Sequence, residues 1–351
     1  MELRNLPIIL KNAPGFLGAF FLVAAGTSCK ERDQGGDWTG QSQSTPALAP
    51  ALASAPKPAS SPASAGPVAK AEAAAKGALV RLVTYNVENW LTTDRYVDRK
   101  LVPGTPKPEA ERRKVTEAIL SAKPDILGIS EIGNERDVKD LQKYLSDAGM
   151  ELPHFYLNRG SDLTRSLVIL SRYPIGKTVA HENLSYHLGG REYAMLRGIL
   201  DASIDTPAGA FRFLGVHLKS KREVEDGDQE EMRRQEAHLL RREIDSILEA
   251  DPQARLVVYG DFNDTRNSPT MKTVHGSGRG SMSLNMIALK DSRGQYWTHY
   301  WDYQDTYTRI DYVLVSQALR RSIEWDHSKI IDNEAVAGAS DHRPLLVILK
   351  K

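Results

Sequence analysis

Polar side chains that could take part in catalysis recur where the predicted strands of this chain begin or end. Loops at the ends of packed strands are where a rigid scaffold presents functional groups. We therefore treat the strand-end motifs as candidates for one functional site. Six motifs occupy such places: Tyr85–Glu88, Ser130–Ile132, Gly215–Ser220, Gly260–Asp264, Arg309–Tyr312 and Ser340–Pro344.

Two of these motifs offer hard oxygen ligands for a metal ion. Glu131 supplies a carboxylate and Asn86 an amide oxygen. Oxygen ligands without clustered cysteine or histidine favour Mg²⁺ or Mn²⁺ over zinc, and the chain contains one cysteine. Each residue also has a structural explanation on its own, Glu131 as a solvated carboxylate at a strand end and Asn86 as a turn cap.

A histidine in the last motif is suited to proton transfer. Attack by a water molecule needs a group that takes its proton. His342 is the natural general base because an imidazole titrates near neutral pH. Its neighbour Asp341 is a candidate for a further metal ligand or a water-bridged one. The structural alternative for His342 is a loop-capping role beside Pro344.

Hydrophobic periodicity predicts one α/β domain over residues 77–351. Amphipathic helices are expected at about 109–122, 138–148 and 237–248. So many strands with few helices favour two packed sheets covered by helices over a simple Rossmann sheet. The strands are expected at 79–85, 125–131, 166–170, 197–204, 211–217, 255–259, 311–316 and 345–349.

The order of the motifs resembles the endonuclease/exonuclease/phosphatase superfamily. That group includes deoxyribonucleases, abasic-site endonucleases, neutral sphingomyelinases and inositol polyphosphate 5-phosphatases. The resemblance covers essentially all of residues 77–351, and it implies a four-layer α/β/β/α sandwich of two mostly antiparallel mixed sheets flanked by helices. The matching set, in chain order, is Asn86, Glu131, His217, GDFN at 260–263, Asp311 and SDH at 340–342.

The resemblance also implies a role for each catalytic residue. Asp311 would orient His342 and stabilise its imidazolium form, and Asp261 would position the attacking water. Asn263 and His217 would donate to the phosphate. The structural alternatives are a tight turn for Asp261 and Asn263 and a satisfied core position for His217.

The residues that would contact the rest of the substrate are less clear from the sequence. Lys219 is placed to meet a phosphate, and Arg191 and Tyr193 precede a predicted strand and are candidates to face the substrate. The aromatic stretch at 296–307 is compatible with a base-stacking platform or a membrane-dipping hairpin. We favour a strand pair that leads into 310–315 with half-buried rings.

Composition limits the classes of protein that remain. The chain has 351 residues, 41% hydrophobic and 26% charged, with a net charge of +1 and a mean hydropathy of -0.41. These values exclude a polytopic membrane protein and a wholly disordered chain. Residues 77–351 hold 39 basic and 40 acidic residues. A nuclease that tracks long nucleic acid by charge would show a basic surplus, so small esters and lipid head groups stay open.

The first 76 residues read as an export signal and a tether. Residues 1–29 have a basic flank and a short apolar core typical of a signal peptide, too short to favour a membrane span. Residues 30–76 form an Ala/Pro/Ser-rich segment, which we expect to be disordered. Cys29 lies where a lipoprotein carries its lipid, although the preceding residues resemble a lipobox only loosely. Ordinary signal cleavage is the alternative, and either route predicts an exported protein, lipid-anchored in the cell envelope or secreted or periplasmic.

We therefore expect an exported, Mg²⁺- or Mn²⁺-dependent phosphoesterase that cuts phosphodiester bonds in nucleic acid. A phosphatase or a sphingomyelinase-like phosphodiesterase of the same fold is the enzymatic alternative. A non-catalytic cell-envelope binding lipoprotein is the alternative of another class. The expected partners are a phosphate ester and, if Cys29 is lipidated, a membrane; no protein partner is implied.

Overall fold

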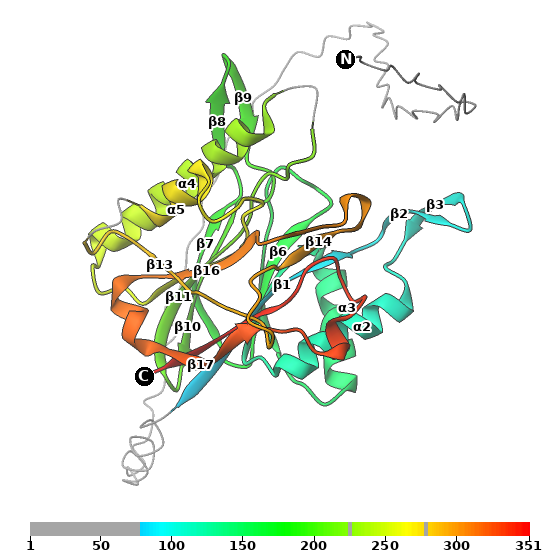
Figure 1. Ribbon diagram of the computed structural model, residues 1–351, viewed down its shortest axis with the longest axis horizontal. Coiled ribbons are helices and arrows are strands. Elements are labelled where there is room, and N and C mark those ends of the chain that lie inside the picture. The colour runs from blue at the N-terminus through cyan, green and yellow to red at the C-terminus, as the bar shows by residue number, and fades with distance from the viewer. Residues whose placement is uncertain (1–77, 224–226, 277–279) are drawn as a thin grey trace, which may run out of the picture. The chain divides into compact units, whose positions relative to one another are not determined.

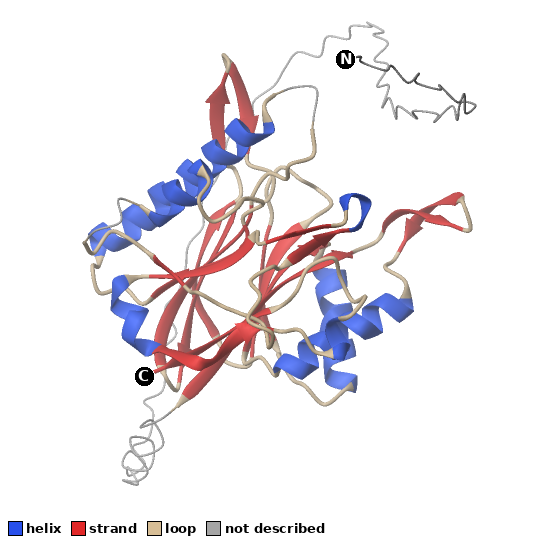
Figure 2. Ribbon diagram, viewed as in Figure 1, coloured by secondary structure: helices blue, strands red, loops and turns tan. Residues whose placement is uncertain are grey.

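The computed structural model describes residues 78–223, 227–276 and 280–351. The predicted signal peptide, tether and lipid-attachment residue Cys29 lie outside these ranges. Within them, two six-stranded sheets are flanked by helices (Figures 1 and 2). No helix in this described part is long and apolar enough to cross a membrane.

The first sheet has the strand order β17-β18-β1-β4-β6-β5. All neighbours are antiparallel except β1 and β4, which are parallel. The strands are β1 (Leu79–Trp90), β4 (Ile126–Ile132), β5 (His154–Asn158), β6 (Ser166–Ser171), β17 (Ile323–Ile330) and β18 (Leu345–Lys350).

The second sheet repeats this plan with the order β13-β16-β12-β11-β10-β7. Its single parallel pair is β11 with β12. The strands are β7 (Ile175–His181), β10 (Ile199–Thr206), β11 (Gly209–His217), β12 (Leu256–Asp261), β13 (Asn285–Met286) and β16 (Asp311–Val315). Both sheets are thus mixed and mostly antiparallel, which confirms the predicted fold class.

Helices close the two outer faces because each parallel pair needs a crossover connection. Helix α2 (Glu109–Ala122) joins β1 to β4, and α4 (Gln229–Ala250) joins β11 to β12. Buried residues of α2 and of α3 (Glu135–Asp147) pack on the first sheet, and those of α4 and α5 (Pro269–His275) pack on the second. The four layers are therefore helix, sheet, sheet, helix.

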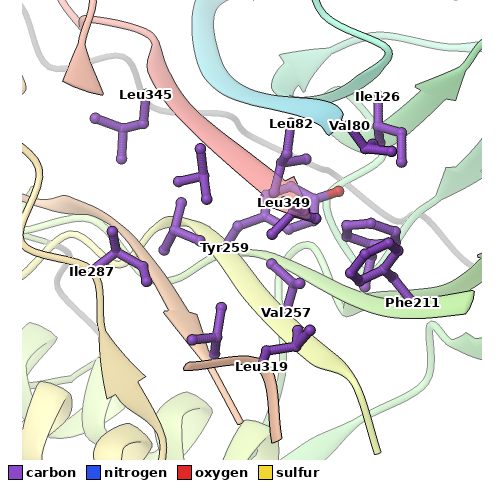
Figure 3. Packing of buried hydrophobic residues seen from close by; sticks show 14 of the residues in the cluster. Val80, Leu82, Ile126, Phe211, Val257, Tyr259, Ile287, Leu319, Leu345 and Leu349 are labelled. Atoms are coloured by element: carbon purple, nitrogen blue, oxygen red, sulfur yellow. The ribbon is translucent and has the colours of Figure 1, made fainter. Parts of the chain in front are cut away.

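The space between the sheets is filled by aliphatic and aromatic side chains, including Val80, Leu82, Phe211 and Tyr259 (Figure 3). Tyr259 lies across the gap from Gly128 of β4. A Cβ on Gly128 would meet the Tyr259 ring at 2.1 Å. The absence of a side chain at residue 128 is what lets this ring fit between the sheets.

The remaining elements are short. Three hairpins pair β2 with β3, β8 with β9, and β14 with β15. The last of these confirms that the aromatic stretch forms a strand pair. The elements are β2 (Thr93–Val97), β3 (Lys100–Thr105), β8 (Ser185–Leu188), β9 (Arg191–Ala194), β14 (His299–Trp301) and β15 (Thr306–Thr308), with 3-10 helices η1 (Asp302–Gln304), η2 (Gln317–Ser322) and η3 (Glu334–Val336).

Replacing Gly128 by alanine should destabilise the fold. The added methyl overlaps the Tyr259 ring, and overpacking a dense core typically costs about 1–3 kcal/mol. Urea unfolding should show this as a lower midpoint with an unchanged slope. The matched control is Gly176→Ala on β7, where the nearest atom lies at 3.4 Å and little change is expected. Equal midpoints for the two variants would contradict the packing described for Tyr259.

Candidate active site

Three of the predicted catalytic residues stand side by side at one end of the second sheet. His217 ends β11, Asp261 ends β12 and Asp311 begins β16. Strand register pairs His217 with Asp261 and Asp261 with Asp311. The parallel pair and its antiparallel neighbour therefore fix the three side chains in adjacent positions without help from a flexible loop.

The first sheet supplies Asn86 and Glu131 from the ends of β1 and β4. The register of β4 with β6 shifts between Ser130 and Ile132, and Glu131 takes a left-handed backbone with φ of 63°. An irregularity of this kind re-aims a side chain at a strand end. Glu131 Oε1 consequently lies 3.3 Å from Asn86 Nδ2.

His342 joins the two sheets at the centre of the site. Its Nδ1 lies 2.8 Å from Asp311 Oδ2, and since an ionised carboxylate can only accept, Nδ1 carries the proton. This bond leaves Nε2 facing Asp261 Oδ2 at 3.7 Å and Asn86 Nδ2 at 3.4 Å. Burial disfavours the imidazolium, but the charges of Asp311 and Asp261 outweigh it and hold the pKa of His342 well above its usual value.

Asp261 is a buried carboxylate among other carboxylates. Burial, and then the charge of Asp311, raises the pKa of Asp261 to about 7. Its Oδ1 accepts from the backbone N–H of Asn263 at 2.8 Å, and its Oδ2 accepts from Asn86 Nδ2 at 3.2 Å. A carboxyl group that titrates near neutrality can bind and orient a water molecule in either protonation state.

His217 lies on the other side of Asp261, with Nε2 3.6 Å from Asp261 Oδ2 and 3.9 Å from Glu131 Oε1. Burial, and then the charge of Arg197, holds the pKa of His217 well below its usual value. His217 is therefore a neutral imidazole beside two carboxylates. In that state it can donate one hydrogen bond from Nε2, as its predicted role requires.

Two of the predicted metal ligands, Asn86 and Asp341, interact with Glu88. The oxygen of Asn86 accepts from the backbone N–H of Glu88 at 3.1 Å, while its Nδ2 is the atom that faces Glu131. Metal ligation by the Asn86 oxygen stays a prediction. Asp341 is half exposed, with Oδ2 3.6 Å from His299 Nε2. Burial, and then the charge of Asp341, raises the pKa of Glu88.

This donor set fits a hard divalent cation. Two groups of described side chains, Asp261–Asp311–His342 and His299–Asp341–His342, bring potential ligand atoms close enough to share an ion. The charge of Glu131 also acts on Asp261, and that of Asp341 acts on Glu88. Carboxylate oxygens are the ligands that Mg²⁺ and Mn²⁺ prefer. Glu88, which was not singled out from the sequence, stands in the same motif as Asn86, two residues further on.

Two residues predicted to contact the phosphate, Asn263 and Lys219, donate hydrogen bonds to nearby backbone carbonyls. Asn263 Nδ2 donates to the carbonyl of Leu218 at 3.0 Å, which leaves its second N–H for a ligand. Lys219 is buried, and its Nζ lies 3.3 Å from the carbonyls of Ser220 and Arg222. A contact between Lys219 and a phosphate stays a prediction, and it would require the ammonium to leave these carbonyls.

Arg191 and Tyr193 lie on the β8–β9 hairpin, which packs against α4. The ring of Tyr193 stacks on Tyr186 at 5.8 Å, and a role for either residue toward the substrate stays a prediction. The structure draws attention instead to Arg197, which was not predicted. It is 8% exposed, its Nε lies 3.5 Å from Asp162 Oδ2, and its charge acts on His217.

An aromatic pocket opens beside His342. It has a volume of about 330 Å³, and its wall includes Trp297, Tyr300, Tyr307, Asp341 and His342. The rings of Tyr300 and Tyr307 stack at 4.5 Å, and Trp297 meets Tyr307 edge-on at 4.7 Å. The aromatic strand pair is therefore also part of the wall of the site.

Solved structures of similar fold are numerous. An endonuclease/exonuclease/phosphatase from Bacteroides vulgatus is 21% identical, with a TM-score of 0.53 over 78% of this chain and 99% of that one. TDP2 from Caenorhabditis elegans is 15% identical, with a TM-score of 0.52 over 78% and 98%. The human Nocturnin catalytic domain is 17% identical, with a TM-score of 0.52 over 78% and 97%. At these identities the likeness establishes the fold alone.

The sequence comparison assigns the family. No curated protein matches this chain in sequence. The model of the endonuclease/exonuclease/phosphatase family matches residues 83–342, a span that contains every member of the catalytic cluster from Asn86 to His342. The chain therefore belongs to the endonuclease/exonuclease/phosphatase family.

Proposed function

We propose that this protein is an exported, divalent-metal-dependent phosphodiesterase that hydrolyses nucleic acid. Membership of the family supports a metal-dependent phosphoesterase or nuclease. The observation that carries the proposal is the convergence of three groups. Asp261 Oδ2 lies 3.6 Å from His217 Nε2 and 3.7 Å from His342 Nε2. Two proton-accepting groups and a neutral donor at one point are what attack by water on a phosphate requires.

His342 and Asp261 divide the handling of the water. Asp311 holds the proton on Nδ1, so the lone pair of neutral His342 lies on Nε2 and faces Asp261. Asp261 orients the water, and Nε2 takes its proton as the water oxygen bonds to phosphorus and the P–O bond to the leaving group breaks. The departing oxygen then takes a proton from solvent. Asp311 then stabilises the imidazolium through the same 2.8 Å hydrogen bond. His217 and Asn263 donate to the phosphoryl oxygens.

The metal would be held by Glu131, with Glu88, Asp341 and Asn86 as the further ligands available. When bound, a divalent cation neutralises charge on the phosphoryl oxygens and favours the charged form of nearby carboxylates and the neutral form of nearby imidazoles. A neutral His342 is the form that the general-base role needs.

The aromatic pocket favours nucleic acid over a simple phosphomonoester. A base bound beside His342 could stack on Tyr300 and Tyr307, and such stacking is typically worth about 1–3 kcal/mol per base. The substrates of a phosphatase of the same fold, or of a phospholipid phosphodiesterase, carry no base that would stack on these rings. These alternatives are separated by offering DNA, RNA, inositol phosphates and sphingomyelin in parallel.

Export rests on residues 1–29, and we propose that Cys29 carries a lipid that anchors the tether at a membrane. Acylation would also protect a lone thiol in an exported protein. Mass spectrometry of the mature N-terminus decides this: a diacylated Cys29 is expected, and an unmodified terminus on either side of it removes the lipoprotein proposal but leaves the enzyme untouched.

Removing the catalytic groups should abolish metal-dependent hydrolysis. His342→Ala should lower kcat on DNA about 10²–10⁴-fold, because general acid–base catalysis contributes that much. Asp261→Ala should have an effect of similar size, and EDTA should remove activity in the wild type. His238→Ala, an exposed histidine on α4, is the matched control and should retain full activity. Hydrolysis that survives both catalytic substitutions would overturn these assignments.

The activity should rise with pH as His342 loses its proton. The charge of Asp311 should determine the pH at which this rise occurs. The negative charge of Asp311 raises the pKa of both His342 and Asp261. Asp311→Asn removes that charge, so the ascending limb of kcat/KM should move to lower pH while the maximum falls. The measurement is a pH–rate profile at saturating Mg²⁺. An ascending limb that stays in place would show that Asp311 does not act through the protonation of this pair.

A further inference from the structure

A basic groove lies beside helix α5, apart from the catalytic cluster. Its volume is about 450 Å³. Among its described lining residues three are cationic, one is histidine, one is tryptophan, and none is acidic. They are Arg266, Asn267, Met271, Lys272, His275, Gly276, Asn285, Met286, Arg320 and Trp325.

Helix geometry explains only part of this charge. Lys272 and His275 lie in the last turn of α5, where cations stabilise the helix dipole. Arg266 and Arg320 are exposed and belong to other segments, the loop before α5 and η2. Arg320 also lies in the last turn of its own short helix, but Arg266 lies in no helix, and both line the same groove as Lys272.

An exposed aromatic ring completes the groove. Trp325 lies on β17, at the edge of the first sheet, and is 47% exposed. The facing wall is β13, at the edge of the second sheet. In Figure 1, α5, β13 and β17 lie on the same side of the molecule. The groove therefore combines phosphate-binding cations with a ring on which a base can stack, and it bridges the two sheets at their edges.

One end of the groove lies near the catalytic cluster. Arg266 follows Asn263 by three residues, so their Cα atoms are at most about 11 Å apart. The other end is more distant, because β13 pairs with Leu314 and Val315, at the end of β16 away from Asp311. Arg266 also lies close to Arg309, whose pKa is lowered by burial and then by the charge of Arg266. Arg309 in turn stands two residues before Asp311.

We propose that this groove binds a single-stranded part of the substrate a few nucleotides away from the bond that is cut. Its phosphates would lie on Arg266, Lys272 and Arg320, and a base would stack on Trp325. The inference rests on the proposed function and adds to it that a single-stranded segment of the nucleic acid is held outside the catalytic cluster. It also shows how a domain with no basic surplus can bind one, through a local concentration of charge.

The test compares two substrates of different length on the full chain with Mg²⁺. A small aryl phosphodiester reports on the catalytic cluster alone, and a single-stranded DNA of about 12 nucleotides spans both sites. For the variant Arg266→Gln/Lys272→Gln/Arg320→Gln, KM for the oligonucleotide should rise at least about 10-fold. The slope of log KM against log salt should fall by about 2, because each phosphate contact on a single strand contributes about 0.7. For the aryl diester, kcat and KM of this variant should each stay within about 2-fold of the wild-type values.

Two further variants separate charge and stacking from a general structural effect. Trp325→Ala should raise KM for the oligonucleotide about 10-fold, and Trp325→Phe should restore most of the loss. Lys177→Gln, on exposed β7 at the opposite edge of the second sheet, removes a matched charge and should change nothing.

The outcomes distinguish the inference from the proposed function. If the wild type cleaves the oligonucleotide and the triple variant does so with the same KM and salt slope, the groove assignment is wrong and the proposed function stands. If the wild type cleaves the aryl diester but no nucleic acid, the proposed substrate class is wrong and the groove assignment falls with it. A loss on both substrates together would place these residues in the support of the fold, and would also overturn the inference.

Discussion

The structure depends on the burial of negative charge at the ends of its central strands. Asp261 is 2% exposed, yet it lies beside Asp311 on the next strand and opposite Glu131 of the other sheet. Uncompensated carboxylates in such a place are costly, so the group holds protons, pairs with His342 or binds a cation. The raised pKa values of Asp261 and His342 are two consequences of this one constraint. The fit to a divalent cation is the third.

The sandwich keeps this charge in place through its two parallel strand pairs. Each sheet is antiparallel apart from one central parallel pair, and that pair ends at the site. Asn86 of β1 and His217 of β11 occupy corresponding positions in the two sheets. Packing between the sheets, in which Tyr259 fills the space left by Gly128, sets the separation of their ends. A change in the core between the sheets would therefore move the two halves of the catalytic cluster relative to each other.

The sequence was sufficient for the architecture and for the central residues. Helix 109–122 has the observed bounds of α2, and the expected strands correspond to β1, β4, β6, β10, β11, β12, β16 and β18. The four edge strands β5, β7, β13 and β17 were not predicted, because edge strands such as Ile175–His181 are largely exposed and lack a buried alternating pattern, and β13 has two residues. The interactions of Glu88 with Asp341 and of Arg197 with His217 could not be predicted either, because these partners are far apart in the chain. The left-handed backbone of Glu131 and Asn263 could not be predicted from the sequence either, because such strain at functional sites is imposed by the surrounding fold.

The central claim is that the carboxylates at the strand ends form a metal site next to the His342–Asp311 pair. Anomalous diffraction from crystals grown with Mn²⁺ tests this claim most directly. The account predicts an anomalous peak at the Glu131 carboxylate, on the side of Asp261 and His342, and its loss in Glu131→Gln. A peak elsewhere in an enzyme whose activity requires Mn²⁺, or a peak that survives Glu131→Gln unchanged, would contradict the account.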